Sequence, residues 1–178
     1  MYQEYANFPT SAGLLAYLTS QGISSYYDGA GALFVSDLAK AQSLASAYNP
    51  LPAIQQQALT TVAATLAAKL AAGLAIGSNV IAIDAAAQSE IAALAILALA
   101  TISGTATTPW PTGRTWPVVS GTPIPLATPQ DLIAVGAPAA HYVWSLKNYA
   151  TLLAAQIGAA TTAAAVQAID LTSGWPTS

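Results

Sequence analysis

Short apolar runs separated by turn signals fill the first fifty residues of the chain. A first helix is expected after a Ser11 cap, because leucines recur there at helical spacing, and Gly22 is placed to end it. Strand-like runs at residues 23–27 and 32–35 flank an Asp-Gly turn signal and predict a hairpin. A second helix is expected after a Ser36 cap, and an Asn-Pro-Leu-Pro break ends it.

A long helix, a hairpin and a strongly apolar helix are predicted next. The helix that begins at Pro52 carries leucine and valine at steps of three and four, and Gly73 stops it. Runs at 74–76 and 80–83 flank a Gly-Ser-Asn turn and predict a short hairpin. Residues 84–102 then form a helix that is apolar nearly all round, so we expect it to be buried on several sides.

The rest of the chain predicts another hairpin and two helices. Runs at 115–119 and 122–126 flank a Ser-Gly turn and predict that hairpin. Thr128 opens a long helix with a cap, a first-position proline and a carboxylate in the first turn. Pro138 is expected to kink or restart this helix. A last short helix covers roughly 161–169.

These elements indicate an α+β fold that is mostly helical, with about five to six helices and short β-hairpins forming a small antiparallel sheet. We expect two parts: residues 1–50 as an N-terminal segment that could serve as a docking module, and residues 51–178 as one α+β domain.

The mean hydropathy of +0.53 raises the question of a membrane segment. The most apolar window, Ile91 to Ala100, is ten residues long, whereas a spanning helix needs about 20 apolar residues. The first five residues carry neither a basic nor an apolar stretch of the kind that begins a signal peptide. We therefore expect a soluble protein made in the cytoplasm.

Charged residues are only 6% of the chain, and its net charge is −3. Soluble domains usually hold roughly 25% charged residues. A surface of threonine, serine, glutamine and alanine is poorly protected against association, which favours a chain whose faces are covered by partner subunits. Compositional bias of an alanine-rich genome is the alternative explanation.

The residue inventory excludes most chemistry. Cysteine is absent and His141 is the single histidine, so a cysteine nucleophile and a histidine-rich metal site are excluded. No basic patch supports binding to nucleic acid. A face shared by His141, Asp131 and Lys147 lacks a nucleophile-elbow pattern, and no phosphate-loop spacing occurs. We expect no enzyme activity, no cofactor and no metal.

The aromatic residues are better candidates for packing or interface roles. Trp144 and Tyr149 point to different faces of one helix, which favours one core contact and one partner contact. Trp175, next to Pro176, is expected to pack on the helix that carries Val143 and Leu146, or on a neighbouring subunit. The same two alternatives, edge packing and interface anchoring, hold for two further residues: Trp110 and Trp116.

A series of short motifs follows in a set order along about two thirds of the chain. In chain order the motifs are Ala63 to Leu70, Gly73-Leu74-Ala75-Ile76, Ile83-Asp84, Gln88-Ser89-Glu90-Ile91, Trp116, Leu126-Ala127-Thr128, Ala139-Ala140-His141-Tyr142-Val143, Gln156-Ile157-Gly158-Ala159-Ala160-Thr161-Thr162, Ala168-Ile169-Asp170 and Gly174-Trp175-Pro176. In their order and spacing, over about residues 60–176, they resemble the C-terminal domain of unknown function found in tail-fibre and tail-fibre-assembly proteins of tailed bacteriophages.

This resemblance implies a virion or fibre-assembly role without a catalytic activity. We expect a structural component of a tailed-phage virion, in the tail or the tail-fibre apparatus, that acts through subunit contacts. Its expected partners are other phage tail proteins and copies of itself, with no nucleic acid and no membrane insertion, and its expected location is the virion after synthesis in the bacterial cytoplasm. The alternative is a tail-fibre assembly chaperone absent from the mature particle.

Overall fold

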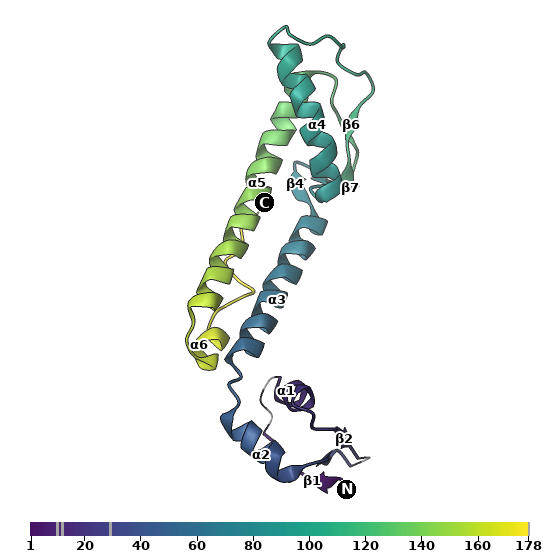
Figure 1. Cartoon of the computed structure of the whole chain (residues 1–178). Helices are drawn as coiled ribbons and strands as arrows, with labels where there is room; N and C mark the ends of the chain where they lie inside the picture. Colours follow the sequence, from purple (N-terminus) through teal and green to yellow (C-terminus); the bar gives the residue numbers. More distant parts are fainter. Residues whose placement is uncertain (10, 12, 29, 178) are drawn as a thin grey trace. The chain divides into compact units, whose positions relative to one another are not determined.

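The computed structural model describes residues 1–9, 11, 13–28 and 30–177, and Figure 1 shows the course of the chain. The helices among these residues are α1 Leu14–Ser20, α2 Leu38–Ala47, α3 Leu51–Ala72, α4 Ala85–Ile102, α5 Pro129–Ala159 and α6 Ala163–Gln167. The strands are β1 Gln3–Glu4, β2 Ser25–Tyr27, β3 Leu33–Val35, β4 Leu74–Ile76, β5 Asn79–Ile81, β6 Thr115–Trp116, β7 Val118–Ser120 and β8 Ile124–Pro125. The predicted α+β, mostly helical fold is confirmed.

The short strands form three small antiparallel sheets in the described part of the chain. Their strand orders are β1-β3-β2, β4-β5-β7 and β6-β8. Contacts divide the chain into two compact units. The first unit contains residues 1–60 and 156–170, and the second contains residues 61–155 and 171–178. The predicted division at residue 50 stays a prediction.

The first unit has its own hydrophobic core beneath the β1-β3-β2 sheet. Alternation along β3 places Leu33 and Val35 inside and leaves Phe34 on the opposite face. The core residues are Tyr5, Leu14, Leu18, Ile23, Leu33, Val35 and Ala41. The predicted β2–β3 hairpin is confirmed, and Asp28 accepts backbone N–H bonds from Ala30 and Ala32 within the turn. The glycine of the predicted Asp-Gly signal lies outside the described residues.

Two predicted helix caps in this unit were wrong by one or two positions. Gly13, at φ 76°, precedes α1 without a side-chain cap, and Ser11 contributes only its backbone carbonyl. Asp37 rather than Ser36 caps α2, and its carboxylate accepts the N–H of Lys40. The Ser36 hydroxyl instead accepts the N–H of Ser24 from the neighbouring strand region, so the hairpin uses the side chain that sequence reasoning had assigned to the helix.

In the second unit, the β4–β5 hairpin after α3 is confirmed. Gly73 ends α3 at φ 83°, and a Cβ atom at this position would lie 2.5 Å from the carbonyl oxygen of Ile81. Only glycine fits such a close approach of helix end and strand without strain. Residues 115–126 depart from the predicted simple hairpin: β6 pairs with β8, but β7 pairs with β5. The β-branched residues of β7 thereby cover an edge that the β4–β5 hairpin would otherwise expose.

Helix α5 begins as predicted. The Asp131 carboxylate accepts both the backbone N–H and the hydroxyl of Thr128, and the Asp131 N–H bonds back to that hydroxyl. Pro138 lies inside the helix, which continues without a restart to Ala159. Of the two outcomes expected at Pro138, a restart does not occur, and a kink stays a prediction. The predicted short final helix is confirmed as α6, and Thr162 caps it.

Helix α4 corrects a second expectation. The helix begins where the sequence predicted, and Asp84 caps it, with its carboxylate accepting the N–H of Ala87. The helix was expected to be buried on several sides, yet only 11% of its 18 residues are buried. By length and composition alone, α4 is long and apolar enough to cross a membrane. Among the described residues, one helix meets this criterion. The lack of a polar face suggested burial, but α4 exposes apolar side chains to solvent instead.

Candidate interaction surface

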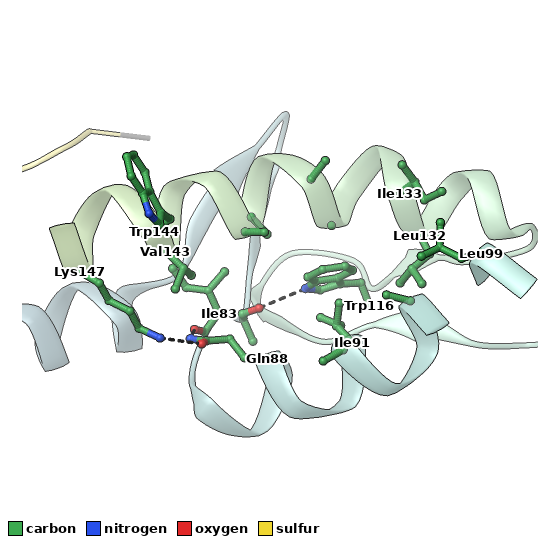
Figure 2. A pocket seen from close by; sticks show the side chains of 17 residues that line it. Ile83, Gln88, Ile91, Leu99, Trp116, Leu132, Ile133, Val143, Trp144 and Lys147 are labelled. Atoms are coloured by element: carbon green, nitrogen blue, oxygen red, sulfur yellow. Dashed lines mark hydrogen bonds between the residues drawn. The ribbon is translucent and has the colours of Figure 1, made fainter. Parts of the chain in front are cut away.

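An apolar groove of about 610 Å³ lies within the second unit, between α4 and the first half of α5 (Figure 2). Gln88 and Lys147 are at one end, and Leu99 and Leu132 are at the other, so the two helices run antiparallel along it. The residues that line it are Ala82, Ile83, Gln88, Ile91, Ala92, Ala95, Leu99, Trp116, Leu132, Ile133, Gly136, Ala137, Ala139, Ala140, Val143, Trp144 and Lys147.

The buried side chain of Trp116 forms the floor of the groove. Its ring is 1% exposed, and its indole N–H donates to the carbonyl of Ala82 at 3.1 Å. A Cβ atom on Gly136 would lie 3.6 Å from this ring, so α5 passes close over the indole. Alanines on the facing surfaces of both helices, such as Ala92 and Ala140, fill little of the space above it. The groove stays open because its walls are made of small side chains.

Polar side chains gather at one end of the groove only. The Gln88 amide donates to the carbonyl of Ile83 at 2.6 Å, and its oxygen accepts from the Lys147 ammonium at 3.2 Å (Figure 2). The salt bridge between Arg114 and Glu90, at 3.0 Å, lies outside the lining, and both side chains are about half exposed. The rest of the groove is apolar, which suits contact with another apolar surface.

The rim of the groove exposes large apolar side chains. Ile96 is 73% exposed, Leu99 63% and Ile102 48%, and these residues recur on α4 at steps of three. Across the groove, Ile133 is 42% exposed and Trp144 is 62% exposed on α5. We call these five residues and the groove between them the α4–α5 patch. Sequence reasoning singled out Trp144 alone among the five, because a helix that is apolar all round gives no sign of which side faces solvent.

The predicted aromatic candidates separate into exposed and buried residues. Trp144 is exposed in the patch, with its ring centroid 6.2 Å from that of His141. Trp116 is buried, and Trp110 is half-buried with its indole N–H donating to the carbonyl of Leu126 at 2.9 Å. Tyr149 is half-buried and belongs to a second cluster further along α5.

That second cluster is built around Trp175, which is 5% exposed. Its ring packs edge-on against Tyr149 of α5 at 5.1 Å between centroids, and its N–H donates to the carbonyl of Leu171 at 3.0 Å. The Lys69 ammonium lies 6.0 Å from the ring centroid. The half-buried Pro176 accepts a long hydrogen bond of 3.5 Å from Tyr142 through its carbonyl. Trp175 therefore packs on the expected helix, where its ring contacts Tyr149.

The polar residues weighed as a catalytic set are not brought together. Asp131 serves the cap of α5, and His141 is ten residues further along the same helix, about 15 Å away. His141 is exposed, while Lys147 bonds to Gln88. Among the described residues, no group of three or more His, Asp or Glu side chains is placed to hold a metal ion.

A smaller aromatic surface lies on the first unit. Tyr2 packs edge-on against Tyr26 at 5.1 Å, and Tyr26 stacks on Phe34 at 5.2 Å. Tyr2, Tyr26 and Tyr27 are each about half exposed. Tyrosine is enriched at protein interfaces, because it combines a large apolar ring with a polar tip. Residues before position 50 therefore carry a separate candidate contact surface.

Comparison with known proteins places the second part of the chain in a family. A family model described as a domain of unknown function, DUF4376, matches residues 53–172. The chain belongs to this family. The matched residues include the α4–α5 patch and α6, whereas the exposed tyrosines of the first unit lie outside the match. No curated protein and no solved structure matches the chain.

Proposed function

We propose that this protein is a structural component of a tailed-phage virion, in the tail or the tail-fibre apparatus, and that it acts through subunit contacts. The observation that carries the proposal is the exposed apolar surface of the α4–α5 patch. Exposed apolar patches of this kind mark surfaces that are covered by another molecule. The assignment to a phage tail is supported by the ordered motifs described from the sequence.

The composition of the chain supports a contact role over a chemical one. Only 6% of the residues are charged, so few side chains keep copies of the protein or its neighbours apart. The polar groups in the groove, Gln88 and Lys147, bond to each other. We propose that the protein is not an enzyme, and that the α4–α5 patch binds protein surfaces.

The exposed tyrosines of the first unit support a docking role for the N-terminal segment. Tyr2, Tyr26 and Tyr27 present aromatic rings on a sheet that has its own core. We propose that this surface contacts a different tail protein. The two units would then have separate partners.

Mass spectrometry of purified virions tests the proposal against its alternative. The phage that encodes the chain is purified by gradient centrifugation, and peptides of the chain are quantified in the particles and in the infected lysate. A constant number of copies for each particle is the expected result. Peptides that are abundant in the lysate and absent from the particles would contradict a virion role. They would favour an assembly chaperone, whose open apolar groove would hold a client segment.

A further inference from the structure

The α4–α5 patch has the features of a surface that pairs with itself. We propose that a second copy of this chain binds there, with α4 of each copy lying in the groove between α4 and α5 of the other. The two pairs of helices would form a four-helix layer around a two-fold axis. This inference rests on the proposed function only in that both assign the patch to subunit contacts, and its tests are independent of a phage.

The area of the patch matches what a stable dimer needs. The five large rim residues, which are 42% to 73% exposed, are joined by exposed alanines of both helices, such as Ala92 and Ala137. Together they present on the order of 800 Å² of apolar surface, which is the share of one partner in an interface of standard size.

The shape of the patch is self-complementary. Ile96, Leu99 and Ile102 recur at steps of three and form a ridge on α4, and this ridge meets the alanine-lined groove at Leu99. Leu99 belongs to both, because it lines the groove and is 63% exposed. A two-fold interface requires one patch to supply both the projecting and the receiving surface. Ridge and groove on separate faces would instead build rings or filaments.

Charge favours an identical partner over a membrane. The rim residues are uncharged, so two copies of the patch do not repel each other. The patch also has no rim charge that would require an oppositely charged residue on a different partner. The uncharged part of α4, Ile91 to Ile102, is about 18 Å long, against about 30 Å for the hydrocarbon core of a bilayer. Ala87 and Ala98 are buried against the rest of the unit, so inserting this helix would disrupt its packing. The net charge of −3 also disfavours anionic lipid surfaces.

A matched pair of substitutions tests the face. Leu99→Glu places a charge in the patch, and Leu152→Glu places the same charge on an exposed leucine of α5 that does not line the groove. Both full-length variants are compared with the parent by sedimentation over a range of concentrations, with circular dichroism as the folding check. We expect Leu99→Glu to weaken the dimer more than about 10-fold, with Leu152→Glu close to the parent.

Single cysteines test the two-fold geometry, because the native chain contains none. Leu99 is the middle residue of the ridge and lines the groove, so its two copies should face each other across the axis. Leu99→Cys should form covalent dimers with a short bis-maleimide crosslinker, and Leu152→Cys should not. This test does not require the charged variant to fold.

Three results would overturn the inference. They are a parent chain that stays monomeric, a dimer that Leu99→Glu leaves intact, and equal crosslinking of both cysteine variants. Co-flotation of the parent with phosphatidylcholine vesicles, lost in Leu99→Glu, would assign the patch to a membrane instead. A monomer in solution whose peptides are present in purified virions would refute self-pairing and leave the structural role in place. A chain that forms the dimer in solution but is absent from purified virions would refute the structural role and leave self-pairing in place.

Discussion

At the scale of single residues, similar tryptophans have different environments in the same unit. Trp144 is 62% exposed, whereas Trp175 is 5% exposed and bonded through its indole N–H. Sequence spacing predicted that Trp144 and Tyr149 face different directions, which agrees with one exposed and one half-buried ring. It could not predict which would be exposed, because that depends on the segment after α6 that returns to α5. The segment that covers Tyr149 contains Trp175, which is distant in sequence, so the residues around Tyr149 carry no signal of it.

Replacing Trp175 by alanine should destabilise the protein by about 3 kcal/mol, because it removes a buried ring and leaves a cavity beside Tyr149. Leu152→Ala, at an exposed leucine outside the α4–α5 patch, is the control, and it should change the free energy of unfolding by less than about 0.5 kcal/mol. Urea denaturation of both variants measures the difference. Equal costs for the two substitutions would show that burial of Trp175 does not stabilise the fold.

His141→Gln should leave folding and association nearly unchanged. The side chain is exposed, and its ring contact is with Trp144 at 6.2 Å between centroids. Melting temperature and sedimentation of the variant give the check, together with infectivity where the phage can be grown. Loss of infectivity in a variant that folds and associates normally would require a chemical role for this histidine.

At the scale of elements, local rules predicted ends and turns well, and long-range pairing poorly. The start of α4 at Asp84, the cap at Thr128 and the turn between β4 and β5 follow from nearby residues, so they could be predicted from the sequence. The pairing of β7 with β5 joins segments about forty residues apart and was missed. The groove was missed for the same reason, since its walls and its Trp116 floor come from three separate segments.

Pro138 gives a prediction at this scale. It lies in the interior of α5, where a proline removes one backbone hydrogen bond and crowds the preceding turn. The residue is exposed, so alanine should fit without a clash. Pro138→Ala should therefore raise the stability by about 1–3 kcal/mol, measured by urea denaturation. A destabilised variant would mean that the proline shapes α5 in a way that the rest of the unit needs.

At the scale of the whole molecule, the low content of charged residues and the exposure of α4 both give the protein an apolar surface. A helix with one charged residue, Glu90, presents apolar side chains to solvent in a chain with 6% charged residues. Composition predicts association, and we propose the α4–α5 patch as the specific surface for it. Composition alone could not locate that surface, because alanine, leucine and isoleucine also fill the core.

An association driven by this surface should be insensitive to salt. Screening weakens contacts between exposed charges, but apolar contacts persist and salting-out ions strengthen them. We expect a homo-oligomer by light scattering at tens of micromolar, with a dissociation constant at about 0.5 M NaCl equal to or below that at about 0.05 M. The melting temperature should also rise with protein concentration, because association stabilises the folded state by mass action. Dissociation at the higher salt concentration would show that charged groups hold the copies together. The ion pair of Arg114 and Glu90 and the lysine at the end of the groove would then be the first residues to replace.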